Sequence, residues 1–258
     1  HLIDEACKPL GLVRQVYVAS EGVYFSTNNC IVLINGNSEI SWFPKTIFHR
    51  TYFVSNNIYT IQPDVGLTVI EDNSIKLVPK GEMFEKTKIY CMIPFDKNHI
   101  LLGTQNKGFY LYNTQALTDK SIHPDSIIKP FNTNNNKFFK DNWVYNGVRL
   151  PSGNFAIGTY RGGVAVFNSA GEIKHYIGKE QGLQDETIWY INHDSQENIW
   201  LALNNGISYA SISSQITYFN ESMGYQGVLQ SVVLHNGKVQ TLEFLFLTTK
   251  NLRELKGS

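Results

Sequence analysis

One short pattern recurs along the chain and limits its possible folds more than any other feature: an apolar run, a polar turn and a second apolar run. The best copies are 99–112 and 154–167, each with Gly-Thr at the end of its first run, and 198–209 is looser. Weaker copies occupy 22–34 and 57–70. Five units of hairpin length predict a chain built from repeated antiparallel strand pairs.

Each hairpin is flanked by further strand-forming sequence. The upstream runs are rich in β-branched and aromatic residues and lie at 13–18, 49–54, 88–94, 143–150 and 187–193. A shorter run follows the hairpin, most clearly at 172–177 and 215–219. Four short strands joined by tight turns, starting again every 36 to 55 residues, are typical of β-propeller blades.

We therefore predict an all-β fold, a β-propeller of four-stranded antiparallel blades. Five to six blades are present, and an incomplete ring remains an open alternative. We treat residues 1–258 as a single propeller domain. Its blades are expected near 13–43, 47–78, 88–131, 143–177 and 187–219, with an incomplete sixth from 227. The first strand of each blade should lie nearest the axis.

Turn residues support this division. Ser152-Gly153 and Asn236-Gly237 follow first strands, whereas Arg161-Gly162-Gly163 and Asn205-Gly206 follow second strands, where residues tolerant of positive φ are needed. The polar insertion 114–141 is interpreted as an enlarged loop leaving the third blade.

Composition excludes several classes of function. Lys+Arg and Asp+Glu both number 22, and no stretch concentrates basic residues, so we expect no nucleic-acid partner. No run approaches the roughly 18 apolar residues of a membrane span, so we expect membrane attachment only through further segments of a longer protein. Cys30 and Cys91 lie in apolar runs and are interpreted as small buried hydrophobes. Seven histidines show neither HxH nor HExxH spacing, so we expect no metal site and no cofactor.

The segment 182–206 carries a family resemblance. It runs Gly182-Leu183, two polar residues, an apolar strand, Asp194 with a turn, Ile-Trp-Leu, and then two polar residues and a glycine. This resembles the two-component regulator propeller repeat, although Ala202-Leu203 replaces Gly-Thr and Glu197 replaces the turn glycine. The match is strongest over the fifth blade, fair over the third and fourth, and a matter of pattern alone over the first two.

The resemblance implies a function as well as a fold. Such repeats are typical of the periplasmic sensor region of bacterial hybrid two-component and related one-component regulators, many of which recognise carbohydrate fragments. We therefore expect a periplasmic ligand-sensing module of an inner-membrane regulator, whose partner is a small molecule or an oligosaccharide. Homodimerisation is left open. We expect no enzymatic activity in this region, while a kinase output could lie in another part of the whole protein.

Two alternatives stay open. One is a glycan-active propeller enzyme, a hydrolase or a lyase, and the other is a protein-binding scaffold, because a propeller fold does not determine function. The sequence holds no GxSxG, P-loop or GxGxxG motif, and no acid stands out as half of a catalytic pair. The segment from Asp194 to Trp200 resembles the Asp-box turn of sialidases without its glycine, and we expect Asp194 to cap a turn instead.

A ligand should bind on the face where second-to-third-strand turns and inter-blade connections emerge. Tyr160 and Arg161 attract most attention, because neither is a turn-preferring type and both precede Gly162. An arginine and aromatic rings suit anionic or hydroxyl-rich sugars. The full set of expected ligand-binding residues is Tyr160, Arg161, Trp143, Asn106, Lys107, Asn205 and Asp185. We expect Trp189 and Trp200 to be inter-blade core, since strands alternate their faces.

Overall fold

The computed structural model describes residues 12–36, 38–212, 228–235, 238–244 and 253–256. The chain separates into two compact units, His1–Ser213 and Ser214–Ser258. The first unit contains five antiparallel sheets, and each of them is formed by strands that are consecutive in the sequence. The second contains one three-stranded antiparallel sheet with the order β20-β21-β22.

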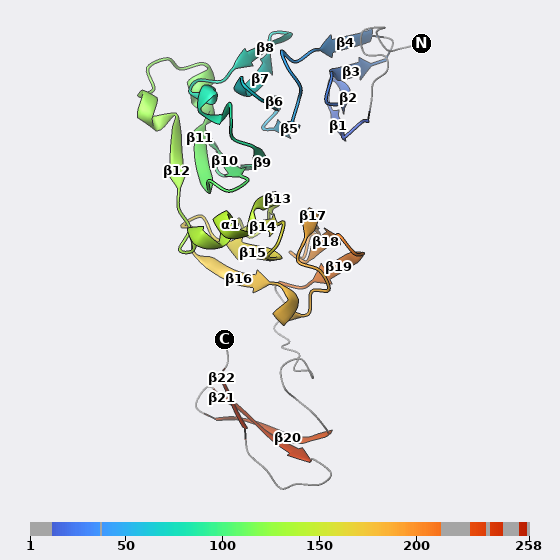
Figure 1. Ribbon diagram of the computed structural model, residues 1–258, viewed down its shortest axis with the longest axis vertical. Coiled ribbons are helices and arrows are strands. Elements are labelled where there is room, and N and C mark those ends of the chain that lie inside the picture. The colour runs from blue at the N-terminus through green and yellow to red at the C-terminus, as the bar shows by residue number, and fades with distance from the viewer. Residues whose placement is uncertain (1–11, 37, 213–227, 236–237, 245–252, 257–258) are drawn as a thin grey trace. The chain divides into compact units, whose positions relative to one another are not determined.

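The five sheets of the first unit are the blades of a propeller. In Figure 1 the first strand of each blade lies at the axis and the last strand lies outermost. The strands are β1 (Gln15–Ala19), β2 (Gly22–Ser26), β3 (Ile31–Asn35) and β4 (Ser38–Trp42); β5 (Arg50–Val54), β6 (Asn57–Gln62), β7 (Gly66–Glu71) and β8 (Ser74–Leu77); β9 (Ile89–Pro94), β10 (His99–Thr104), β11 (Phe109–Asn113) and β12 (Ile128–Phe131); β13 (Val144–Arg149), β14 (Phe155–Thr159), β15 (Val164–Phe167) and β16 (Ile173–Ile177); and β17 (Ile188–His193), β18 (Ile199–Leu203) and β19 (Ile207–Ala210).

In the part of the chain that the structure describes, helices are few and short. They are the α-helix α1 (Asn136–Asn142) and the 3₁₀ helices η2 (Gly81–Phe84), η3 (Thr114–Leu117), η4 (Pro124–Ser126) and η5 (Lys179–Gln181). The second unit contains β20 (Val228–His235), β21 (Lys238–Phe244) and β22 (Arg253–Lys256). The predicted all-β propeller is therefore confirmed, with five blades described. The fourth strand expected at 215–219 and the turn Asn236-Gly237 lie outside the described residues.

The hydrophobic core lies between neighbouring blades, because a two-residue alternation sends side chains to both faces of each sheet. Along β10, Ile100 and Leu102 pack in the cluster shared with the second blade, whereas Leu101 packs in the cluster shared with the fourth. Along β14, Phe155 and Ala156 divide in the same way between the third and fifth blades. The third and fourth blades are thus buried on both faces.

The Gly-Thr pair at the end of a hairpin's first strand has a physical role. A Cβ on Gly158 would lie 2.6 Å from Cγ2 of Ile188, so only glycine lets the inner strand of the next blade approach this closely. The hydroxyl of Thr159 donates to the carbonyl of Gly163 (2.9 Å) and accepts from the amide of Gly162 (2.9 Å), which closes the following turn. Gly163 has a φ of 68°, as its place in this turn requires.

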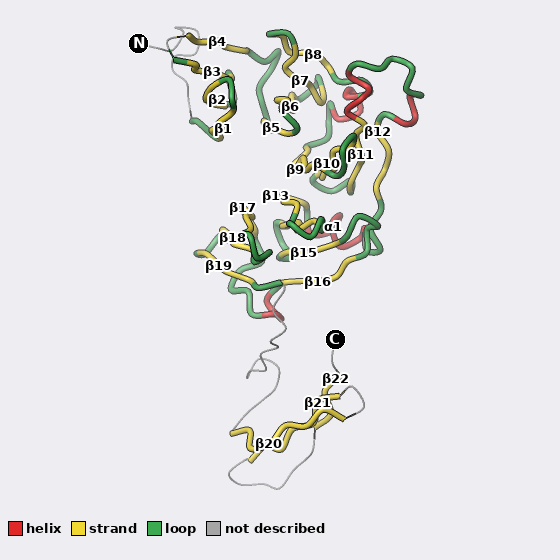
Figure 2. The backbone as a smooth tube through the Cα atoms, turned by 180° about the vertical axis from the view of Figure 1, so that it is seen from behind, coloured by secondary structure: helices red, strands yellow, loops and turns green. Residues whose placement is uncertain are grey.

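The insertion 114–141 contains more order than an enlarged loop. It holds η3, η4, the fourth strand of the third blade and most of α1, as the red and yellow segments of Figure 2 show. Phe139 of α1 is fully buried between the third and fourth blades, with its ring centroid 4.8 Å from that of Phe109. The insertion therefore seals the outer edge of this blade–blade junction.

Asp194 and Trp200, both in the fifth blade, were given structural roles by the sequence. The carboxylate of Asp194 accepts hydrogen bonds from the amides of Gln196 (2.9 Å) and Asn198 (3.0 Å), so the turn-capping role is confirmed. Its hydrogen bond with the Asn198 side chain helps to lower its pKa. The expectation for Trp200 is wrong: its side chain lies on the face of β18 opposite the fourth blade and is 49% exposed.

Cys30 and Cys91 are buried free thiols, as the sequence predicts. Burial raises the pKa of the Cys91 thiol to about 12, so the reactive thiolate is scarce at neutral or mildly alkaline pH. We expect Cys91 to resist iodoacetamide at pH 8 in the native protein and to react fully in urea, as measured by peptide mass spectrometry. Fast native labelling of Cys91 would contradict this burial.

Candidate functional site

Three aromatic residues reach the propeller axis because the inner strands carry β-bulges. In β9, β13 and β17 the pairing with the second strand skips one residue, and the skipped residues are Tyr90, Tyr145 and Trp189. A bulge turns its extra side chain away from the normal alternation. The rings form a continuous row, with centroids 5.0 Å apart both between Tyr90 and Tyr145 and between Tyr145 and Trp189. The expectation that Trp189 is inter-blade core is therefore wrong, and its side chain is 39% exposed.

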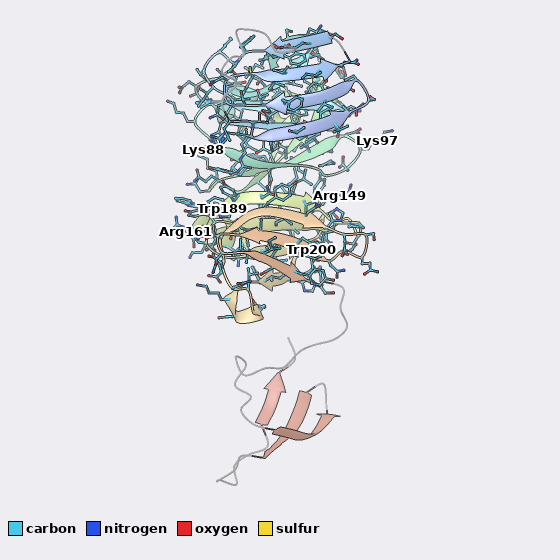
Figure 3. All side chains as sticks on the ribbon, turned by 90° about the vertical axis from the view of Figure 1, so that its right-hand side faces the viewer. Lys88, Lys97, Arg149, Arg161, Trp189 and Trp200 are labelled. Atoms are coloured by element: carbon cyan, nitrogen blue, oxygen red, sulfur yellow. The ribbon has the colours of Figure 1, made fainter. Side chains whose placement is uncertain are left out.

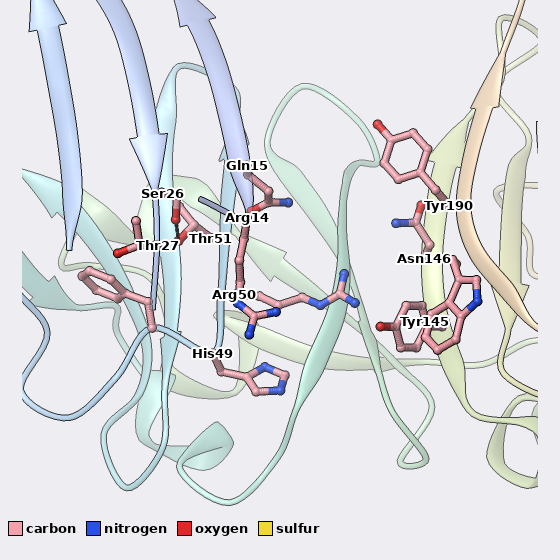
Figure 4. Close-up of a pocket in the computed structure, with 12 residues that line it drawn as sticks. Arg14, Gln15, Ser26, Thr27, His49, Arg50, Thr51, Tyr145, Asn146 and Tyr190 are labelled. Carbon is pink, nitrogen blue, oxygen red and sulfur yellow. Dashed lines mark hydrogen bonds between the residues drawn. The ribbon is translucent and has the colours of Figure 1, made fainter. Parts of the chain in front are cut away.

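A pocket of about 270 Å³ lies beside this row, at the end of the ring where the inner strands begin. We call it the axial pocket. Its lining residues come from the first, second, fourth and fifth blades and are Arg14, Gln15, Ser26, Thr27, Phe48, His49, Arg50, Thr51, Tyr145, Asn146, Trp189 and Tyr190. In Figure 4, Arg14 and His49 lie across the pocket from Asn146 and Tyr190, and Arg50 reaches toward the Tyr145 ring.

Arg50 is held by two aromatic rings. Its guanidinium carbon lies 4.6 Å from the ring centroid of Tyr90 and 4.8 Å from that of Tyr145. Cation–π contacts of this kind stabilise the charged group and restrict its motion. One further bond, from Nη1 to the Tyr90 carbonyl, is long at 3.5 Å. The guanidinium is thus positioned by stacking and keeps donor capacity for a ligand.

His49 lies next to this arginine and is uncharged at neutral pH. Burial lowers its pKa to about 4, helped by the positive charges of Lys88, Arg50 and Arg14. Its ring packs edge-on against Tyr90, with centroids 5.5 Å apart. The buried Nδ1 has no hydrogen-bond partner among the described residues. A buried nitrogen without a partner is costly, so a hydrogen bond gained there would be stabilising.

The structure brings together three of the residues expected from the sequence. Arg161 lies over the ring of Trp143, with its guanidinium carbon 4.1 Å from the centroid. Trp143 in turn stacks on Tyr160 at 6.1 Å, and Tyr160 contacts Trp189 at 5.8 Å. Trp143 has a φ of 60°, an unfavourable conformation for a residue other than glycine and one that is common at functional sites. This group extends the aromatic row to the rim, beside a smaller hollow of about 170 Å³.

The other four expected residues take structural or solvent-exposed places. The amine of Lys107 donates to the hydroxyl of Thr87 (2.9 Å), and Asp185 accepts from the amide of Thr187 (2.8 Å), which caps an inter-blade connection. Asn106 and Asn205 are exposed in turns. Among the described residues, no hydrogen bond or ring contact joins any of these four to the aromatic row.

The sequence patterns did not indicate the residues of the axial pocket as ligand-binding residues. One available signal is an aromatic residue directly after a β-branched one at the start of three inner strands: Ile89-Tyr90, Val144-Tyr145 and Ile188-Trp189. The first two blades have polar pairs instead, Arg14-Gln15 and His49-Arg50. Comparison of repeat positions across blades would therefore have pointed to the axis.

Nowhere in the described ranges do three His, Cys, Asp or Glu side chains come close enough together to hold a metal ion. In the same ranges, no helix has the length and apolar character that a bilayer crossing requires.

Comparison with known proteins shows the fold. No protein-family profile matches the sequence. No curated protein matches it either. Among solved structures, the WD40 propeller of Doa1 has a TM-score of 0.60 at 12% identity, with 79% of this chain and 64% of that one covered.

Two similar structures are extracellular domains from Bacteroides thetaiotaomicron. The domain assigned to the hybrid two-component system BT3049 has a TM-score of 0.56 at 18% identity and covers 89% of this chain. The domain assigned to the one-component system BT4673 has a TM-score of 0.57 at 17% identity and also covers 89%. This chain spans only 31% and 32% of their lengths. Virginiamycin B lyase from Staphylococcus aureus is similar too, with a TM-score of 0.54 at 14% identity and with 90% of this chain and 77% of the lyase covered. At these identities the likeness is one of fold: this chain is a β-propeller, similar in fold to the extracellular domains of these two Bacteroides systems.

Proposed function

We propose that the chain is the ligand-recognition module of a bacterial periplasmic sensor, and that a small carbohydrate-derived ligand binds in the axial pocket. The observation that carries the proposal is the meeting of aromatic rings from three blades with two arginines at one end of the axis. Rings stack on the faces of sugars, while amides and guanidinium groups bind their hydroxyls and acidic groups.

The repeat at 182–206 supports the sensor class, since it resembles the two-component regulator propeller repeat. The fold similarity to two extracellular sensor domains points the same way. A ligand at the axis would contact several blades at once, so binding would tie together their relative positions. That property suits a module that reports occupancy to another part of a protein.

The experiment is a binding screen with a paired tryptophan control. Oligosaccharides from plant, host and microbial polysaccharides are titrated calorimetrically, and the mixtures are analysed for products. For the ligand that binds, Trp189→Ala should weaken affinity by about 5- to 30-fold, because an aromatic ring that lines the pocket is removed. Trp200→Ala should not change the affinity. Trp189 lies in β17 and Trp200 in β18, and Figure 3 shows them well separated on the fifth blade.

The outcomes separate the candidate functions. Binding without turnover that depends on Trp189 supports the sensor module. Release of product under catalytic conditions would favour a glycan-active enzyme. Equal affinity in the wild type and in Trp189→Ala would place the ligand outside the axial pocket.

A further inference from the structure

The charged side chains that line the axial pocket are all positive. Arg14 and Arg50 line it, and none of its lining residues carries a carboxylate. The chain as a whole is neutral, with 22 basic and 22 acidic residues. Elsewhere exposed lysines have acidic partners, such as Lys76 with Asp72 (2.7 Å) and Lys137 with Asp141 (2.9 Å). Within the described residues, neither pocket arginine forms an ion pair.

The two arginines present donors toward the same space. The Tyr90 and Tyr145 rings lie 4.6 and 4.8 Å from the Arg50 guanidinium carbon and 5.0 Å from each other, so both contact it from one side, and N–H groups on its other side remain for a ligand. Arg14 donates through Nε to the side-chain oxygen of Asn28, so its terminal nitrogens remain for another acceptor. Planar N–H pairs of this kind match the oxygens of a carboxylate or a sulfate.

His49 adds a third polar group on this side. Its buried Nδ1 has no partner among the described residues and lies in the wall that contains both arginines. The groups that act on His49 are all cationic: Arg14 before β1, Arg50 on β5 and Lys88 before β9. An anion placed among them would offset this repulsion.

We propose that Arg14, His49 and Arg50 form an anion subsite that binds the carboxylate or sulfate group of an acidic sugar. This inference rests on the proposed function, since it names the class of ligand for the axial pocket. The volume of about 270 Å³ is at the lower end for ligand pockets, so it suits the acidic end of an oligosaccharide. The bulged aromatic rings then face the uncharged part of the sugar.

In this arrangement, binding of an anion should be linked to uptake of a proton by His49. The free His49 has a pKa of about 4 and is neutral at pH 7. A bound oxyanion favours the imidazolium form, so it raises the pKa of His49, and binding takes up a proton between the free and bound values. Affinity for the anion should therefore rise as the pH falls from 7 toward 5, until the acidic group of the ligand itself is protonated.

The first experiment uses inorganic sulfate as the probe on the 258-residue chain. Histidine NMR titrations are recorded in sodium sulfate and in sodium chloride at equal ionic strength, and the His49 signal is assigned with His49→Gln. The pKa of His49 should be higher in sulfate than in chloride. Arg14→Gln and Arg50→Gln should each raise the pKa in chloride and abolish most of the sulfate-dependent difference. The same pKa in sulfate and chloride in the wild type would overturn the proposal.

The second experiment distinguishes this proposal from the proposed function. Galacturonate, galactose 6-sulfate and galactose oligomers are compared by calorimetry, which also separates a carboxylate from a sulfate preference. Arg14→Gln should weaken binding of the acidic sugar by about 10- to 150-fold. Arg149→Gln is the matched control, because Arg149 lies at the far end of β13 and is exposed. Neutral-sugar binding that needs Trp189 but neither arginine would overturn the anion subsite and leave the proposed function intact.

Discussion

Phe167→Ala should destabilise the first unit by about 3–5 kcal/mol. The side chain of Phe167 is fully buried between the third and fourth blades. Its ring lies 5.4–5.9 Å from those of Phe109, Phe131, Phe139 and Phe155. Truncation removes both the buried apolar area and the contacts of four neighbouring rings, and a rigid sheet on either side leaves little room for collapse.

Urea unfolding and calorimetry measure this effect. For a unit of this size we expect the melting temperature to fall by about 6–20 °C. Phe43→Ala serves as the control, because Phe43 is 44% exposed and its loss should change stability by less than about 1 kcal/mol. Similar values for the two variants would mean that the phenylalanine cluster is not a core.

Gly158→Val should destabilise the protein by about 1–3 kcal/mol or more, through overpacking and not through a cavity. An added Cβ would lie 2.6 Å from Cγ2 and 2.8 Å from Cβ of Ile188, on the inner strand of the next blade. The two blades must therefore move apart, or the side chain of Ile188 must leave its rotamer. Either response weakens the cluster that joins the fourth and fifth blades.

A double-mutant cycle tests that mechanism. Gly158→Ala and Ile188→Ala should each destabilise the protein, while the double variant should lose less than the sum by about 0.5–3 kcal/mol, because alanine at 188 removes the Cγ2 atom that makes the closer of the two overlaps. Additive losses would show that Gly158 is required for a reason other than this contact.

Much of the fold could be predicted from the sequence because its repeat has a local physical cause. Gly158 and Thr159 occur together since one allows the next blade to approach and the other closes the turn. The same pair at Gly103 and Thr104 therefore marks the same place in another blade. The structure of the insertion 114–141 could not be predicted in the same way. Its composition is polar overall, which gives little sign of the fourth strand of the third blade or of the buried Phe139.

The candidate site could be predicted only at its rim. Tyr160 and Arg161 are adjacent in one turn and neither is a turn-preferring type, so the sequence singles them out, and Trp143 precedes the first strand of the same blade. The pocket itself depends on contacts between distant residues: Arg50 stacks on Tyr90 and Tyr145. A strict two-residue alternation also assigns Trp189 to the wrong environment, because it takes no account of a bulge.

The bulges affect how the binding specificity of such a protein can evolve. Tyr90, Tyr145 and Trp189 lack partners in the strand pairing, and the last two line the pocket. The residue before each bulge, Ile89, Val144 or Ile188, packs in the core between blades. Folding and recognition are therefore encoded by different, interleaved positions of the same strand. Duplication of a blade can preserve the scaffold while the one unpaired residue is free to adapt to a new ligand.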